Sequence, residues 1–280
     1  MNAQGGEMTG DSRAALLAAL ALQAEWGADE ALLETPPDRA AASPQHRPAS
    51  PAAPSAPSAP GTVVRLPTAP SAPGAASFAE LRAALEAFDQ CALKRTATQL
   101  VFADGAEDAR IMIIGEAPGG EEDRIGRPFV GPAGQLLDKM LGSIGLDRGT
   151  VRIVNVVPWR PPGNRTPSDT EIAQCLPFLH RHIALVRPER LVLLGAVAVR
   201  ALIGGKDGIT RLRGKWREVT IEGLDQTLRA LPTYHPAYLL RQPAAKRLAW
   251  ADLLELRREC VESRILRDAD MRNSQDITKS

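Results

Sequence analysis

A long run of proline, alanine and serine divides this chain and limits where a folded core can form. These residue types predominate from Ala41 to Ala75, and prolines recur at every third position from Pro48 to Pro60. Because proline fixes φ and lacks a backbone N–H group, this spacing favours an extended polyproline II conformation. We therefore expect a disordered linker over residues 41–76, with the folded core beyond it.

The segments on either side of this linker differ in pattern. Residues 77–262 are long enough to form one domain, and the polar residues 263–280 are expected to form a frayed tail. Residues 1–40 predict an amphipathic helix that is broken near Gly27. A helix tethered in this way is a candidate docking segment for a protein partner, with a dispensable extension as the alternative. Its apolar positions are Leu16, Leu17, Leu20, Leu22, Trp26, Leu32 and Leu33.

Composition excludes some classes of protein. No apolar run approaches the roughly 18 residues needed to span a bilayer, and the N-terminus has no signal-peptide pattern. Cys91, Cys175 and Cys260 are few and far apart, so we expect a cytoplasmic protein with reduced thiols. The net charge of +1 divides into −3 for residues 1–75, which hold four Arg and seven Asp or Glu, and +4 for the rest. This charge permits nucleic-acid binding without requiring it.

Short β-rich runs alternate with helical patterns in residues 77–262. Strands are expected at 110–114, 151–157, 191–194 and 227–232, with a hairpin-like partner at 215–221. Helices are expected at 77–90, from 133, from 168 and at 243–260, and the first and third of these begin with capping-box spacing. This alternation predicts an α/β fold, a three-layer sandwich in which helices flank a central, mainly parallel four-stranded sheet.

Two glycine-rich motifs follow the first of these strands. The first, Gly115-Glu116-Ala117-Pro118-Gly119, comes directly after the strand, where α/β sheets present loops to ligands. The alternatives are a plain turn or a phosphate loop, but the sequence patterns of nucleotide-binding loops are missing. The second motif covers residues 126–134 and surrounds Phe129 with glycines, so that this ring is either a stacking platform for an extruded base or an ordinary core residue.

Two further motifs carry an amide and an imidazole. Asn155 ends the next strand, and its side chain has the donor and the acceptor needed to read N3–H and O4 of uracil and to reject cytosine; the alternative is a turn cap. A proline-rich loop follows, whose Arg160 and Arg165 could meet phosphates. His235 stands at the end of the last strand, before a proline-led turn, as a candidate electrophile or as a structural hydrogen-bonding residue.

Taken together, these motifs resemble the family-four uracil-DNA glycosylases of the uracil-DNA glycosylase superfamily. The resemblance extends from about Phe88 to Leu256 and is carried by GEAPG, GRPFVGPAG, PPGNRTP and HPAYLLR in the family's order and spacing. It implies a monofunctional enzyme of base excision repair that flips uracil out of single- or double-stranded DNA and hydrolyses its N-glycosidic bond. A monomer without membrane association is expected.

The resemblance also implies roles for individual residues. Phe129 would stack on uracil, Asn155 would bind its edge, and His235 would stabilise charge on the departing base. Ala117 stands where another family places a water-orienting Asp, so Glu116 is assigned to water activation. The expected uracil-binding residues are Gly115, Ala117, Phe129 and Asn155, and the expected DNA-binding residues are Arg160, Asn164, Arg165, Arg213, Lys215, Tyr238, Leu239 and Arg241, with Tyr238, Leu239 and Arg241 forming the family's wedge.

One departure from the family concerns its 4Fe-4S cluster, which four cysteines normally hold. Cys91 and Cys175 match two of these ligands, but Phe88 and Trp159 occupy the other two positions. We therefore expect no cluster and no other cofactor, and we expect the two aromatic residues to form a small hydrophobic plug instead.

Two other classes of function are alternatives to this enzyme. One is a relative that binds uracil or abasic sites in DNA with little turnover, including relatives that attach to DNA through a histidine in an inserted basic loop. No such insertion follows Gly134. Another is a nucleotide-binding protein that uses GEAPG as a phosphate loop, although this motif lacks the lysine that such loops need.

Overall fold

A six-stranded mixed sheet forms the centre of the molecule. The computed structural model describes residues 74–205 and 207–265, so the expected N-terminal helix, nearly all of the linker and most of the tail lie outside the described residues. The strand order is β1-β3-β2-β4-β6-β5. The four central strands are mutually parallel: β3 (Val151–Asn155), β2 (Ile111–Gly115), β4 (Arg190–Leu194) and β6 (Leu228–Thr233).

Two short edge strands correct the expected number of four. β1 (Asp104–Gly105) pairs antiparallel with β3, and β5 (Arg217–Val219) pairs antiparallel with β6. The hairpin-like stretch before the last central strand is thus confirmed as a β5–β6 pair. β1 was not predicted, because a pair of residues as short as Asp104-Gly105 has no strand pattern. Its extended conformation depends on pairing with the neighbouring strand.

Successive residues of the central strands enter two separate cores. In β2, Ile111 and Ile113 belong to one apolar cluster, whereas Met112 and Ile114 belong to the other. All five residues of β2 are buried. Burial on both faces explains why these strands read as continuous apolar runs rather than as alternating ones.

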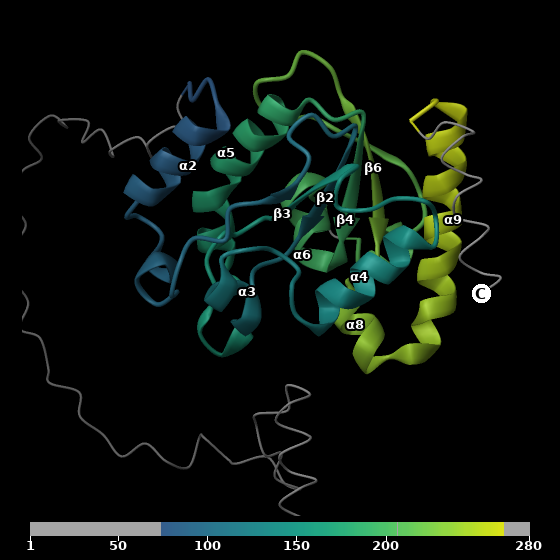
Figure 1. Ribbon diagram of the computed structural model, residues 1–280, viewed down its shortest axis with the longest axis horizontal. Helices are drawn as coiled ribbons and strands as arrows, with labels where there is room; N and C mark the ends of the chain where they lie inside the picture. Colours follow the sequence, from purple (N-terminus) through teal and green to yellow (C-terminus); the bar gives the residue numbers. More distant parts are fainter. Residues whose placement is uncertain (1–73, 206, 266–280) are drawn as a thin grey trace, which may run out of the picture. The chain divides into compact units, whose positions relative to one another are not determined.

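Helices cover both faces of the sheet. Figure 1 shows α2 (Phe78–Ala87) and α5 (Asp169–Val186) on one side, with α4 (Pro132–Gly142), α8 (Pro236–Arg241) and α9 (Lys246–Glu262) on the other. α6 (Gly195–Leu202) packs with the first group. This arrangement confirms a sandwich of helices, sheet and helices. The remaining short elements are α3 (Gly120–Ile125), α7 (Ile209–Leu212) and the 3-10 helices η1 (Ala92–Arg95), η2 (Pro162–Asn164) and η3 (Pro243–Ala245).

Both expected helix starts are present. The Ser77 side chain caps α2 by accepting from Glu80 N at 3.2 Å, and the Ser168 side chain caps α5 by accepting from Glu171 N at 3.2 Å. α2 ends three residues before the expected position, because Phe88 adopts an extended conformation and is buried. The need to place this aromatic ring in the core thus outweighs the helical pattern.

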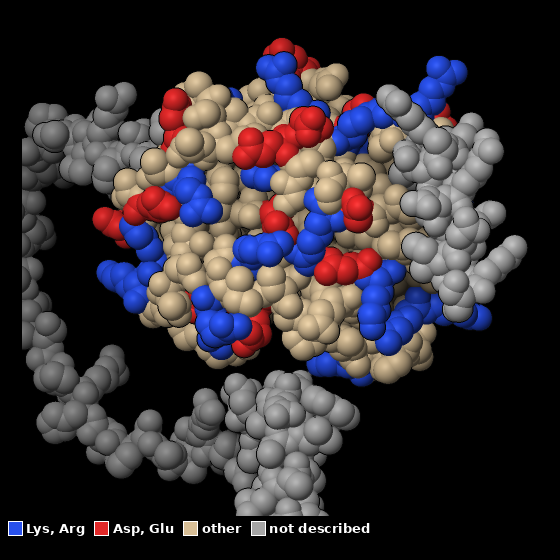
Figure 2. Space-filling model, in the orientation of Figure 1, with Lys and Arg blue, Asp and Glu red and all other residues tan. Residues whose placement is uncertain are grey.

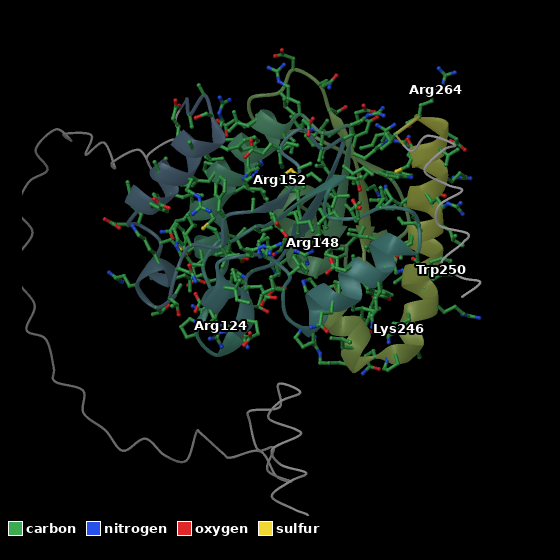
Figure 3. The ribbon with its side chains drawn as sticks, viewed as in Figure 1. Arg124, Arg148, Arg152, Lys246, Trp250 and Arg264 are labelled. Carbon is green, nitrogen blue, oxygen red and sulfur yellow. The ribbon has the colours of Figure 1, made fainter. Side chains whose placement is uncertain are left out.

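A buried arginine joins the sheet to the helices beside its β1 edge. Arg152 Nε donates to His182 Nε2 at 3.2 Å, its Nη1 donates to Gly105 O at 2.8 Å, and its guanidinium lies over the Phe78 ring. Figure 3 labels this side chain inside the fold. Burial, together with the charge of Arg152, lowers the pKa of His182 to about 3. The imidazole therefore stays neutral and can accept this hydrogen bond.

Within the described residues, the helices are all too short or too polar to cross a membrane.

Candidate active site

The expected pocket residues meet at the carboxyl ends of the parallel strands. β2 ends at Gly115 and β3 ends at Asn155, and these two residues are paired in register. β6 ends at Thr233, two residues before His235. Because parallel strands bring their carboxyl ends to one edge of a sheet, three separate motifs are placed side by side.

Gly115 allows the closest contacts in this pocket. A methyl group added to it would lie 2.5 Å from Asn155 Oδ1 and 2.5 Å from Phe129 Cζ. Carbon atoms do not approach other atoms this closely, so only glycine lets the amide and the ring stand together here. Gly195, with φ of +88°, likewise leaves room for His235, whose Cβ would lie 3.1 Å from an added methyl group. Gly195 was not predicted from the sequence, because no motif surrounds it.

Asn155 presents an unpaired acceptor to the pocket. The residue is 6% exposed, and its Oδ1 has no hydrogen-bond partner among the described residues. A buried polar atom without a partner costs about 1–3 kcal/mol. Such a cost is common where a ligand supplies the missing donor.

Phe129 and His235 form the aromatic part of the pocket. Their rings lie 5.5 Å apart between centroids, with an interplanar angle of 30°. Phe129 is 5% exposed and has φ of +55°, a left-handed conformation that is rare for residues other than glycine. Strained backbone of this kind tends to occur at functional sites, and surrounding contacts must hold it.

The proton on His235 is fixed by its own backbone. Ala237 N donates to Nδ1 at 3.1 Å, so in the neutral ring the proton must reside on Nε2. Burial, assisted by the positive charge of Arg241, lowers the pKa of His235 to about 4. At neutral pH the imidazole is therefore an uncharged donor through Nε2.

Glu116 lies beside this cluster and is half-buried. Burial raises the pKa of its carboxyl group, while a hydrogen bond from Thr166 and the charges of Arg200 and Arg241 act in the opposite direction. The backbone of its loop is joined to the segment after β3, because Val156 N donates to Gly115 O at 3.0 Å and Val157 N donates to Glu116 O at 3.1 Å. Ala117 is partly buried in the same loop.

The expected DNA-binding cations differ in whether they already pair with a carboxylate of the protein. Arg160 Nε donates to Asn164 Oδ1 at 2.8 Å, which connects two of the expected residues at the surface. Arg165 instead forms a bidentate pair with Glu171, at 2.9 and 2.7 Å. Arg213 pairs with the buried carboxylate of Asp252. Lys215 and Arg241 are exposed.

The wedge expected on α8 needs a correction. Leu239 is 1% exposed and packs in the core, so its side chain cannot enter DNA. The exposed apolar residues on this helix are Tyr238, at 38%, and Leu240, at 43%. Sequence reasoning missed Leu240, since six residues are too few for helical periodicity to identify the outward face.

The residues at the family's cluster position form a packed apolar group. Phe88 and Trp159 are stacked at 6.3 Å between ring centroids, and Phe88 also meets Phe178 edge-on at 4.9 Å. Cys91 and Cys175 are buried with them, and their thiols are hydrogen-bonded to each other, which lowers the pKa of Cys91 to about 7 and raises that of Cys175.

This group does not fit a 4Fe-4S cluster, which needs four thiolates or equivalent ligands. Across the described ranges 74–205 and 207–265, no three His, Cys, Asp or Glu side chains gather closely enough to hold a metal ion.

Comparisons with known proteins show which family this chain resembles. The model of the family "Uracil DNA glycosylase superfamily" matches residues 102–254. A type-4 uracil-DNA glycosylase from Pyrobaculum aerophilum is 42% identical over 162 residues, which cover 56% of this chain and 82% of that protein. A type-4 enzyme from Thermotoga maritima is 45% identical over 152 residues, or 54% and 77% of the two chains. A type-5 uracil-DNA glycosylase from Pyrobaculum aerophilum is 33% identical over 150 residues, or 48% and 64%.

Proposed function

This chain belongs to the type-4 uracil-DNA glycosylases of the uracil-DNA glycosylase superfamily, and we propose that Gly115, Phe129, Asn155 and His235 form its uracil pocket. The chain is a uracil-DNA glycosylase, a hydrolase of N-glycosidic bonds that acts in base excision repair. Its substrate is uracil-containing DNA, and its products are free uracil and an abasic site.

The unpaired Oδ1 atom of Asn155 is the observation that supports this pocket most strongly. N3–H of uracil would satisfy this acceptor, while the amide NH₂ of the same side chain would donate to O4. Cytosine has an unprotonated N3 and an amino group at position 4, so it would leave both groups of Asn155 unpaired. Discrimination by buried groups that only the right substrate can satisfy reaches about 10⁴–10⁵-fold.

His235 would lower the barrier to bond cleavage. When the C1′–N1 bond breaks, its electron pair passes to uracil, and negative charge develops on O2. The Nε2–H group of a neutral His235 would donate to this oxygen without giving up its proton. A neutral donor suits this task, because the negative charge of the departing base is spread over its ring and its oxygens rather than held on O2 alone.

The other half of the reaction takes place on the sugar. The deoxyribose becomes an oxocarbenium ion, which is captured at C1′ by water, and the water then loses a proton. Glu116 is the proposed acceptor of this proton, because its half-buried carboxyl group lies in the loop directly after Gly115. The uracil anion takes up a proton on release, so that the overall change is hydrolysis.

We further propose how the protein holds DNA. Arg160 and Asn164 would contact phosphates on one side of the pocket, and Lys215 and Arg241 would add charge. Tyr238 and Leu240, exposed on α8, would fill the gap left by the flipped nucleotide in place of Leu239. Both single- and double-stranded DNA remain proposed substrates, and a monomer suffices because one chain supplies the whole pocket.

No cluster or other cofactor takes part in the proposed mechanism. This proposal is supported by the packing of Phe88 and Trp159 against the two remaining cysteines. A cytoplasmic location, and a protein partner for the segment 1–40, remain expectations from the sequence.

Release of uracil from a labelled oligonucleotide tests the proposed pocket. Asn155→Ala removes the paired donor and acceptor, and we expect kcat/KM to fall by at least about 100-fold. The matched control is Asn164→Ala at an exposed position, which should weaken DNA binding but leave the rate at saturating enzyme within about 3-fold of the original.

Two results would contradict parts of the proposed function. Full activity in Asn155→Ala would show that the pocket lies elsewhere. Tight binding of uracil-containing DNA by the unchanged protein, without repeated release of uracil, would favour the alternative of a binding relative with little turnover.

A further inference from the structure

A buried carboxylate joins the two glycine-rich loops of the pocket. Glu122 lies in the first turn of α3 and is 9% exposed. Its Oε2 accepts from Gly119 N at 3.0 Å, and its Oε1 accepts from Val130 N at 2.9 Å and from Gly131 N at 2.8 Å. One side chain thus receives three backbone amides, one from the Gly115–Gly119 loop and two from the loop that carries Phe129.

Two glycines of the motifs make this approach possible. A methyl group on Gly119 would lie 2.7 Å from Glu122 Oε2, and one on Gly131 would lie 3.3 Å from Oε1. Neither glycine has a positive φ, so the requirement here is space rather than backbone freedom. At these two positions, the glycines of the motifs therefore admit a carboxylate of the protein itself.

Phe129 is held from its other side by an arginine. Arg148 donates to Pro128 O at 3.1 Å and also to Phe129 O, while its Nε donates to Asp138 of α4 at 2.8 Å. Figure 3 labels Arg148 beside this helix. The carbonyl of Phe129 is thus fixed by Arg148, and the next two amides are fixed by Glu122. Phe129, the residue with φ of +55°, therefore lies between the Pro128 carbonyl, which Arg148 binds, and the Val130 amide, which Glu122 binds.

We propose that Glu122 is a positioning residue for the glycosylase reaction, because it holds the Phe129 loop against the Gly115–Gly119 loop at the separation that uracil requires. This inference rests on the proposed uracil pocket. Glu122 acts through Phe129 and does not touch the base. Without its carboxylate, the Val130 and Gly131 amides lose their acceptor, and the loop relaxes away from its left-handed conformation.

The neighbouring residue provides a matched control. Asp123 is also a buried carboxylate in the first turn of α3, at 4% exposure. It accepts from Thr98 N at 2.8 Å, Thr98 Oγ1 at 2.8 Å and Gln99 N at 3.3 Å. It therefore carries the same number of hydrogen bonds as Glu122, but to a segment outside the pocket. A purely structural role predicts the same behaviour for both residues.

The experiment compares Glu122→Gln and Asp123→Asn in the full chain. Each replacement keeps the shape of the side chain and converts one acceptor oxygen to a donor. For Glu122→Gln we expect kcat to fall by about 10- to 100-fold, because a displacement of about 1 Å near reacting atoms is that costly. KM for DNA should stay within about 3-fold, and inhibition by free uracil should weaken about 10-fold, because the phosphate contacts are unchanged but the stacking ring has moved.

Asp123→Asn should lose thermal stability while keeping kcat and uracil inhibition within about 3-fold of the original values.

Equal kinetic losses in the two variants, or an unchanged kcat and unchanged uracil inhibition in Glu122→Gln, would overturn the positioning role. An unchanged protein that releases no uracil would instead refute the proposed function. If Glu122→Gln does not fold, Gly131→Ala decides, because its added methyl group displaces the carboxylate by a few tenths of an ångström. This variant should show the same weakened uracil inhibition, and normal inhibition would overturn the proposal.

Discussion

A single backbone amide determines what His235 can do. By donating to Nδ1, Ala237 N leaves Nε2 as the only site for the proton of the neutral ring. The proline at position 236 begins α8 and has no N–H of its own to offer, so the next amide along takes this place. The motif His-Pro-Ala therefore encodes a tautomer as well as a turn, which the sequence alone did not reveal.

The lowered pKa of His235 predicts the pH dependence of uracil release. Because protonation occurs near a pKa of about 4, single-turnover rates should not fall through loss of the neutral imidazole between pH 8 and about pH 5.

His235→Gln should lose about 100- to 1,000-fold in kcat, the usual cost of one such donor. Arg241→Ala removes a cation that opposes protonation, so the pKa of His235 should rise and the acidic limb should move to higher pH.

The same pKa shift affects stability with a definite sign. In the unfolded chain the imidazole takes up a proton near its ordinary pKa of 6.5, whereas in the folded chain it does so only near 4. Between these values the unfolded state binds more protons than the folded state. The free energy of unfolding is therefore unaffected by this group above about pH 6.5, and it decreases as the pH falls towards 4. A smaller loss of stability across this range in His235→Gln than in the unchanged protein checks the assignment, and an identical loss would contradict it.

At the scale of elements, the sequence predicted those structures whose cause is local. The helix cap at Ser77, the capping box at Ser168, the central strands and the α/β alternation follow from neighbouring residues, and all are present. At Ser77 the reciprocal half of the expected capping box is replaced, because the Glu80 carboxylate accepts from Ala76 N. The edge strand β1 and the role of Glu122 depend on segments far apart in the chain. A glycine followed three residues later by glutamate is a recognisable helix start, but nothing local indicates that the same carboxylate reaches Val130 and Gly131.

The aromatic plug between η1, α5 and the segment after β3 predicts a protein without iron. Purified protein should contain no stoichiometric iron and show no broad visible absorption, and chelators should leave its melting temperature unchanged. Phe88→Ala should cost about 3–5 kcal/mol in the free energy of unfolding, because this ring fills the space beside Trp159 and Phe178. Roughly four iron atoms per chain would contradict the plug.

At the scale of the whole molecule, charge is nearly balanced, so DNA binding depends on local placement. The net charge is +1, and Figure 2 shows Lys or Arg interspersed with Asp or Glu over the visible face. Two of the four arginines expected to bind DNA already form ion pairs within the protein, Arg165 with Glu171 and Arg213 with Asp252. Phosphate contacts should therefore come from a small set of free cations rather than from a general positive field.

Salt dependence separates a DNA-contacting arginine from a structural one. Among the residues that the structure describes, Arg160 donates to a neutral amide, that of Asn164. Arg160→Ala should therefore weaken DNA binding and reduce the slope of log K against log salt by about 1, with the melting temperature little changed. Arg213→Ala should leave this slope unchanged, because its guanidinium neutralises Asp252, which is 2% exposed and also accepts from Thr233 Oγ1 at 2.7 Å. Loss of the Arg213 guanidinium leaves the buried Asp252 carboxylate without its cation, which should lower the free energy of unfolding by about 3–5 kcal/mol. A reduced slope in Arg213→Ala would show that Arg213 contacts DNA, because an ion pair within the protein releases no counterions when DNA binds.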